Sequence, residues 1–344
     1  MELEILDPLE YPGWDDLLLT HEDYSFFHSS AWARILCESY GYKPLYFTSI
    51  ENGRLSALIP VMEVKSFLTG KRGVSLPFSD YCEPIVPEEN TFRDICEEII
   101  NYGKKSGWKY FELRGGTQFF HGTTPSSQYY LHTLDLSLNE EQMLSHFRDS
   151  TKRNIKKAMK EGVEVAIGNS LKSIQEFCRL NCITRKHHGL PPQPLYFFEN
   201  IYEHILSKDK GVVIIASHDK KVIAGAVLFL FGKTATYKYG ASDRTYQHLR
   251  PNNLIMWQAI DWSTQNGYTS LFFGKTESEN KGLLQYKHGW GAIEKIVGYY
   301  RHDLSKGAFI ENHSMLTGFH NKIFSKMPIR LLNIVGSMLY KHIG

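Results

Sequence analysis

The chain has 344 residues, of which 42% are hydrophobic and 22% are charged, and its formal net charge is +2. This balance is typical of a soluble globular protein, and the length suits two domains of ordinary size. A nearly neutral chain is not a uniformly basic nucleic-acid-binding protein, so any basic surface must be local.

The first half of the chain contains a predicted hairpin followed by a helix and a strand. Residues 44–61 are typical of two strands joined by a tight turn at Asn52-Gly53. Residues 99–116 are typical of a helix end, a glycine cap at Gly107, a strand and a glycine break. Between these segments, Pro77–Tyr81 follows a further predicted strand.

The second half repeats these features in the same order. Residues 212–229 form a predicted hairpin that turns at Asp219-Lys220, and residues 259–276 form a helix, a cap at Gly267 and a strand that breaks at Gly274. Tyr239–Asp243 takes the place of Pro77–Tyr81. The ordered matches indicate an internal duplication, although hairpins and helix–glycine–strand units are common in unrelated proteins.

Each half is therefore predicted as helix, antiparallel hairpin, further strand, helix and strand. The fold class is α/β with mixed sheets. The predicted domains are residues 1–136 and 137–305, followed by a helical C-terminal tail at 306–344.

The segment from Ser270 to Gly291 is the strongest candidate for chemistry, because ligands gather at strand ends in open α/β sheets. A nucleotide-triphosphate loop is rejected, since its pattern requires glycine where Thr269 stands. Lys275 is instead expected to contact a substrate phosphate or carboxylate. Lys287, which follows Tyr286, is predicted at a flexible turn beside an apolar wall. It could stabilise an oxyanion there, or it could be a solvated lysine.

Two aspartates occupy matching positions after strands in the two halves. Asp80 and Asp243 could hold or deprotonate an amine, or they could cap turns. Tyr81 and Tyr239 could line a groove or belong to the core.

A basic helix is predicted between Arg148 and Val163. At helical spacing, Arg153 and Lys156 share a cationic face with Lys157 and Lys160, while Ile155, Ala158 and Met159 turn inward. This face could contact the phosphates of a nucleic acid or of a sugar diphosphate, or it could be a solvated surface.

The order of hairpin, strand, helix and strand resembles the GNAT acyltransferase unit, and its tandem copy resembles the FemAB family. Particular motifs carry this resemblance over almost the whole chain. They are Phe26–Trp32, Ser75–Tyr81, Arg148–Val163, Arg185–Pro192, Tyr239–Ser242 and Tyr286-Lys287. The tail at Ile323–Leu332 resembles FemAB-like proteins of bacterial exopolysaccharide (PEP-CTERM) systems.

The resemblance implies an acyltransferase that moves an acyl or aminoacyl group to an amine of a peptidoglycan or exopolysaccharide precursor. It implies catalytic roles for Lys287 and Tyr286. Because the first copy ends in Arg114-Gly115-Gly116 without such a Tyr-Lys extension, acceptor binding is assigned mainly to that copy. The acyl donor would be aminoacyl-tRNA or acyl-CoA, with no tightly bound cofactor and no metal. Two alternatives remain, namely an acyl-CoA-dependent N-acetyltransferase acting on an amino sugar and an inactive protein that binds a glycan precursor.

The segment His248–Met256 stands where GNAT enzymes cradle the coenzyme A pyrophosphate. It lacks the usual glycines, and Pro251 removes an amide donor but suits the first turn of a helix. Arg250 and Asn253 are the candidate substrate-binding side chains of this segment. The missing glycines favour aminoacyl-tRNA as the acyl donor. Binding of acyl-CoA through other contacts remains an alternative.

Location and partners are predicted from what the chain contains. Its five cysteines have no zinc-ligand spacing, and it shows no signal peptide and no long apolar segment, which predicts a cytoplasmic protein. The tail mixes basic and apolar residues, so it could lie on the inner membrane or dock on the protein's own core. Expected partners are a small-molecule or lipid-linked precursor and the acceptor end of a tRNA.

Overall fold

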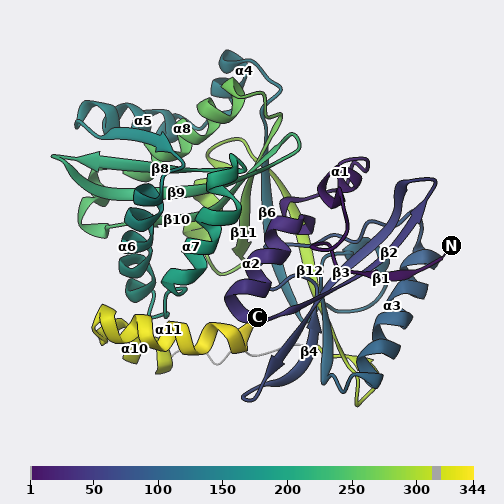
Figure 1. Cartoon of the computed structure of the whole chain (residues 1–344). Helices are drawn as coiled ribbons and strands as arrows, with labels where there is room; N and C mark the ends of the chain where they lie inside the picture. Colours follow the sequence, from purple (N-terminus) through teal and green to yellow (C-terminus); the bar gives the residue numbers. More distant parts are fainter. Residues whose placement is uncertain (1, 312–318) are drawn as a thin grey trace. The chain divides into compact units, whose positions relative to one another are not determined.

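The computed structural model describes residues 2–311 and 319–344 (Figure 1). The chain divides into two compact units. The first comprises the described residues of Met1–Tyr129, Ile296–Met315 and Leu339–Gly344, and the second those of Tyr130–Lys295 and Leu316–Met338. Relative to the predicted boundaries, residues 130–136 belong with the second unit and residues 296–305 with the first.

The first unit is built on a mixed sheet in the order β1-β2-β3-β4-β5-β12. Strands β1 to β4 pair antiparallel, β4 pairs parallel with β5, and β5 pairs antiparallel with β12. The strands are β1 (Glu4–Leu6), β2 (Lys43–Glu51), β3 (Arg54–Ser66), β4 (Gly70–Val74), β5 (Tyr110–Arg114), β12 (Ile293–Asp303) and β13 (Ala308–Phe309), which pairs with β12.

Helices cover this sheet. Helix α3 buries Phe92, Ile95 and Ile99, at helical spacing, in a core with residues of β2, β3 and β5. Trp14 of α1 packs edge-on against Tyr46 of β2, with ring centroids 5.5 Å apart. The helices and helical turns are α1 (Trp14–Leu18), η1 (Phe26–His28), α2 (Ser30–Tyr40), α3 (Glu89–Lys105) and η2 (Thr117–Phe119).

The second unit has a sheet in the order β6-β11-β10-β9-β8-β7. Strands β7 to β10 pair antiparallel, and β10 pairs parallel with β11. The strands are β6 (Ser127–Asp135), β7 (Glu164–Gly168), β8 (Gly211–His218), β9 (Lys221–Phe231), β10 (Thr234–Ser242) and β11 (Ser270–Glu277).

Helices pack on both faces of the β8–β10 meander (Figure 1). Alternate residues such as Val212 and Ile214 face the core formed with α5 and α8. Tyr239, on the other face, packs against aromatic rings of α6 and α7. The helices are α4 (Glu140–His146), α5 (Asp149–Lys160), α6 (Leu171–His187), α7 (Leu195–His204), η3 (Leu206–Lys208), η4 (Arg244–Leu249), α8 (Pro251–Gln265) and α9 (Lys281–His288).

The two units repeat one order of elements, which confirms the predicted fold class. The series β2-β3-β4-α3-β5 in the first unit corresponds to β8-β9-β10-α8-β11 in the second. Both hairpins turn through left-handed residues, Asn52-Gly53 and Asp219-Lys220. This conformation matches strand twist in two-residue hairpins. Each unit is thus a GNAT-like arrangement of mixed strands.

Two local predictions were wrong. Strand β11 does not end at Gly274 but continues to Glu277, with Gly274 in the left-handed region at φ 75°. Met159 of α5 does not turn inward, since 51% of it is exposed, whereas Ile155 and Ala158 are buried.

In the predicted tail at 306–344, residues 319–344 are largely helical, as α10 (Phe319–Lys326) and α11 (Ile329–Ile343), whereas Ala308–Phe309 form the short strand β13. Residues 312–318 of that tail lie outside the described residues. In the second unit, Leu332 is buried and the Cys182 thiol donates to Asn333 Oδ1 at 3.4 Å. Among the described residues, no helix combines the length and apolar character needed to cross a membrane.

Candidate functional site

A cavity of about 770 Å³ lies within the second unit. Residues of α5, β10, η4, α8, β11 and α9 line it. Its cationic side chains are Arg148, Lys238, Arg244, Arg250, Lys275 and Lys287. None of the described lining residues is Asp or Glu. Because six cationic residues and no described acidic residue line this cavity, it suits an anionic ligand.

Lys287 is buried in the wall of this cavity, with only 4% of its surface exposed. The prediction placed it at a flexible turn, but it lies in the last turn of α9. Its Nζ donates to the carbonyl oxygen of Gly274 at 2.7 Å and to that of Lys275 at 3.3 Å. A buried ammonium requires such partners. The left-handed Gly274 lies in the strand segment that supplies both carbonyls.

The ends of α9 are fixed to neighbouring elements. The Asn280 side chain accepts from the Leu283 amide at the start of the helix. At its end, the Gly289 carbonyl accepts from the Arg148 amide at 2.9 Å and from the Thr151 hydroxyl at 3.0 Å. These contacts tie α9 to α5 and hold Lys287 in place.

Tyr286 also lines the cavity. Its hydroxyl donates to the carbonyl oxygen of Asn252 at 3.0 Å, which joins α9 to the start of α8. Burial raises the pKa of Tyr286 well above its usual value, so the hydroxyl stays protonated. Tyr286 is therefore placed as a neutral wall residue rather than as a base.

The start of α8 opens onto the same cavity. Arg250 has a left-handed backbone at φ 61°, and Pro251 takes the first helical position, as predicted. Asn252 and Asn253 line the cavity too, and no side chain caps this helix end. The amide groups of a helix start carry partial positive charge, which adds to the cationic character of the wall.

Two predicted substrate residues of the second unit lie elsewhere. Tyr239 packs among aromatic residues of α6, α7 and β9, and its hydroxyl accepts from Gln193 at 3.3 Å. Asp243 caps η4, accepting from the amide and hydroxyl of Thr245 at 3.0 and 2.7 Å. Neither lines the cavity, and Tyr237 does so in place of Tyr239.

The basic face of α5 is separate from the cavity lining. Arg153 and Lys156 are exposed, whereas Arg148, Ser150, Thr151 and Asn154 contribute to the wall. The predicted contact of the exposed face with phosphates therefore concerns a surface and not this hollow.

Asp80 and Tyr81 belong to the first unit. The Asp80 carbonyl oxygen accepts from the Tyr299 hydroxyl at 2.8 Å. The Tyr81 ring packs edge-on against Phe27 with centroids 6.0 Å apart, and burial raises its pKa. The described lining of the second unit's cavity does not include either residue.

Sequence reasoning overlooked several residues that the fold brings together. Lys238 and Arg244 could have been found only by knowing which face of β10 and η4 they occupy. His132 was overlooked as well. Burial, followed by the nearby charge of Lys287, lowers the pKa of His132 to about 4. The buried imidazole is thus neutral and lies close to the candidate catalytic lysine.

Comparison with known proteins agrees with this architecture. Residues 145–288 match the family described as "Acetyltransferase (GNAT) domain". Over 45% of its length, the chain is 24% identical to a UDP-N-acetylmuramoylpentapeptide-lysine N(6)-alanyltransferase from Weissella viridescens. That match covers 48% of the relative. Over 49% of its length, the chain is 22% identical to a lipid II:glycine glycyltransferase from Staphylococcus saprophyticus, of which 58% is covered. The chain thus spans about half the length of these relatives.

A solved structure of FemX has the same fold over most of the chain. The TM-score is 0.69 at 14% sequence identity, with 86% of this chain and 96% of that chain covered. The fold likeness extends over far more of the molecule than the GNAT family match, as a tandem arrangement requires.

Proposed function

We propose that this chain, a FemAB-like protein with two GNAT-like units, transfers an acyl or aminoacyl group to an amine of a cell-envelope precursor. The observation that carries the proposal is the cation-lined cavity with Lys287 buried in its wall. Acyl-CoA and aminoacyl-tRNA both present phosphates, so either acyl donor would meet complementary charge there. The names of the two relatives, an alanyltransferase and a glycyltransferase, support aminoacyl transfer.

The reaction would begin with attack of the acceptor nitrogen on the carbonyl carbon of the donor. A carbon–nitrogen bond forms and the carbonyl oxygen becomes an oxyanion, which the ammonium of Lys287 would stabilise. The carbon–oxygen bond to tRNA, or the carbon–sulfur bond to coenzyme A, then breaks. The leaving alkoxide or thiolate takes up the proton that the amine releases, which gives an amide and an alcohol or thiol.

The identity of the acyl donor decides between the main proposal and its alternative. The departure from the GNAT glycine pattern at His248–Met256 favours aminoacyl-tRNA, and the start of α8 still offers Asn252 and Asn253. Turnover should be measured with charged tRNA and with acyl-CoA, using a peptidoglycan precursor and an amino sugar as acceptors. Transfer from charged tRNA to the peptide supports the proposal, whereas transfer only from acyl-CoA to the sugar supports the N-acetyltransferase.

A matched pair of variants tests the cavity itself. Arg244→Ala removes a cation that lines it, and Lys172→Ala removes an exposed cation of α6 outside it. We expect only Arg244→Ala to weaken binding of the acyl donor, with a larger loss at low salt. Equal affinities in both variants would contradict the assignment of the cavity as the donor site. Binding of a glycan precursor by the wild-type chain, without transfer from either donor, would indicate the inactive binding protein.

We further propose peripheral membrane contact through α11. Leu331, Ile334 and Met338 are exposed at 52%, 50% and 62%, and their spacing places them on one face of the helix. The exposed basic residues nearby are Lys322, Lys326 and Arg330. Such a combination suits an anionic lipid surface that carries a lipid-linked precursor.

Sedimentation with vesicles tests this contact. The wild-type chain should bind vesicles containing phosphatidylglycerol more than vesicles of phosphatidylcholine alone. The double variant Leu331→Ser/Met338→Ser should lose this binding, whereas Leu171→Ser, at another exposed leucine, should keep it. Equal sedimentation of all three proteins would refute the proposal.

A further inference from the structure

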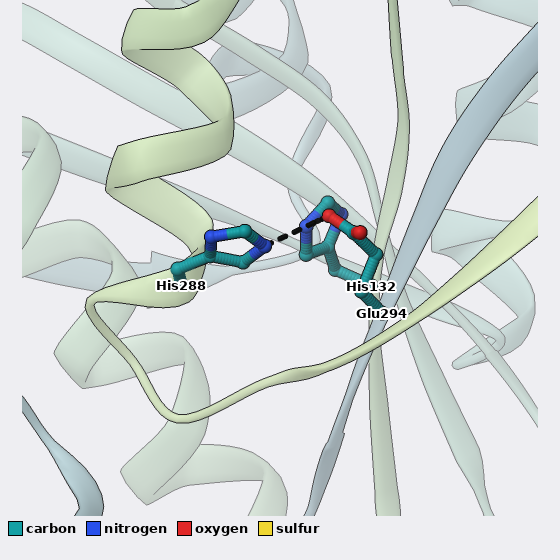
Figure 2. A group of neighbouring side chains, drawn as sticks. All are labelled: His132, His288 and Glu294. Carbon is teal, nitrogen blue, oxygen red and sulfur yellow. Dashed lines mark hydrogen bonds and ion pairs between the residues drawn. The ribbon is translucent and has the colours of Figure 1, made fainter. Parts of the chain in front are cut away.

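Three potential metal ligands of the second unit converge beside the end of α9 (Figure 2). They come from three elements, His132 from β6, His288 from the last turn of α9 and Glu294 from the start of β12. The Glu294 Oε2 lies 2.8 Å from the His288 Nε2 and 3.2 Å from the His132 Nε2. One ligand atom from each residue falls within 4.8 Å of the others.

A cluster held together only by hydrogen bonds does not account for the buried position of His132. Its side chain is fully buried, and neither ring nitrogen has a hydrogen-bond partner of acceptable geometry among the described residues. The approach of Nε2 to Glu294 is close without the alignment of a hydrogen bond. Leaving a buried polar group unsatisfied costs free energy, so a buried imidazole of this kind calls for an additional partner.

The chemistry of the three ligands identifies that partner. Two imidazole nitrogens and one carboxylate are a recurrent protein ligand set for zinc, with a fourth position left open. Magnesium and calcium prefer oxygen ligands, which disfavours them here. Zinc–ligand distances of about 2.0–2.2 Å place tetrahedral ligand atoms roughly 3.3 Å apart. Small side-chain shifts would convert the observed separations into that spacing.

We propose that His132, His288 and Glu294 form a binding site for a divalent transition metal of the zinc class. The metal would fasten the end of α9 to β6 and β12. Because Lys287 precedes His288, the same tether would also fix the position of the candidate catalytic ammonium. Glu294 supplies the one negative charge of the site, which partly offsets the repulsion between the metal and Lys287. This site departs from the expectation of no metal drawn from the sequence.

The test is metal binding by the 344-residue chain, independent of any transfer activity. After removal of metal by a chelator, zinc stoichiometry is measured by equilibrium dialysis, and cobalt(II) is added to report tetrahedral coordination through its visible absorption. We expect one equivalent of zinc and an intense cobalt spectrum. The thermal midpoint of unfolding should also rise with zinc, since a ligand that binds only the folded state stabilises it.

Variants separate a metal site from an ordinary ion pair. Glu294→Gln and His288→Ala, both at partly exposed side chains, should weaken zinc affinity by more than about 100-fold, which exceeds the roughly 10- to 100-fold loss expected when an outer-shell partner is removed. His218→Ala is the matched control, because His218 also lies beside a carboxylate, with Asp219 at 3.3 Å.

Two results would overturn the proposal. One is a folded wild-type chain that retains no zinc and shows no cobalt spectrum. The other is zinc binding that His288→Ala and Glu294→Gln leave at the level of His218→Ala. In either case the three residues form only a hydrogen-bonded cluster.

Discussion

Replacing Lys287 tests the proposed chemistry most directly. Lys287→Met keeps much of the apolar stem but removes the ammonium from the wall of the cavity. Loss of one oxyanion donor in a preorganised site lowers kcat about 10²- to 10³-fold, or roughly 2.7–4 kcal/mol. Lys287 is 4% exposed and is oriented by two carbonyl oxygens, so in its proposed role it would be such a preorganised donor. We therefore expect a loss of that size in kcat with little change in KM.

The assay must separate catalysis from folding and from acyl-donor binding. Single-turnover transfer with saturating donor reports the chemical step, and thermal unfolding reports whether the variant is folded. Lys275→Ala is a useful comparison, since Lys275 also lines the cavity but is expected to bind the acyl donor. It should raise KM more than it lowers kcat. A folded Lys287→Met protein that turns over at the wild-type rate would refute the reasoning.

Three further predictions concern stability and local geometry. Burial alone would raise the pKa of Glu112, but the charges and hydrogen bonds of Arg114 and Arg301 lower it from 4.5 to about 2. This carboxylate therefore stabilises the fold by about 3 kcal/mol above pH 5, and the contribution is lost as pH falls from 4.5 towards 2. In chemical denaturation, the difference in free energy of unfolding between the wild type and Glu112→Gln should shrink as the pH falls through this range. A difference that does not change with pH would contradict the lowered pKa of Glu112. Gly274→Ala should lower the free energy of unfolding by about 1–2 kcal/mol, because a residue with a side chain is strained at φ 75°. The same substitution should reduce kcat, because it displaces the carbonyl groups that hold Lys287. Unchanged stability and kcat would remove Gly274 from that role. Asn280→Ala should lower the free energy of unfolding by about 0.5–2 kcal/mol, because it removes the side-chain cap of α9. Asn280→Asp should retain most of the wild-type stability in thermal unfolding, since aspartate can also accept the capping hydrogen bond. An equal loss in both variants would argue against capping.

The fold could be predicted because its signals are local and repeated. Turn residues such as Asn52-Gly53 and caps such as Gly107 and Gly267 mark boundaries by backbone preference alone. The wrong local prediction at Gly274 has the same origin. A glycine with positive φ is typical of a break, yet β11 continues past it to Glu277.

The site was harder to predict because it depends on which side of an element each residue faces. In β10 the register shifts between Tyr237 and Tyr239, so alternation counted along the sequence assigns both tyrosines to one face, whereas they lie on opposite faces. Lys287 was placed near the chemistry on the strength of a resemblance, but its helical position and burial required the fold. His132 and Glu294 are far apart in the chain and form no spacing motif, so sequence reasoning could not join them.

The charge of the cavity has a consequence for the end of the catalytic cycle. Its cations would hold the phosphate-bearing part of the acyl donor, and this part is the same before and after transfer. Uncharged tRNA or free coenzyme A would then compete with the acyl donor at nearly equal affinity. The cations that bind the carrier's phosphates would not add to the affinity for the amide product. Release of the uncharged tRNA or free coenzyme A should therefore be accelerated by salt, which weakens its attraction to the cations.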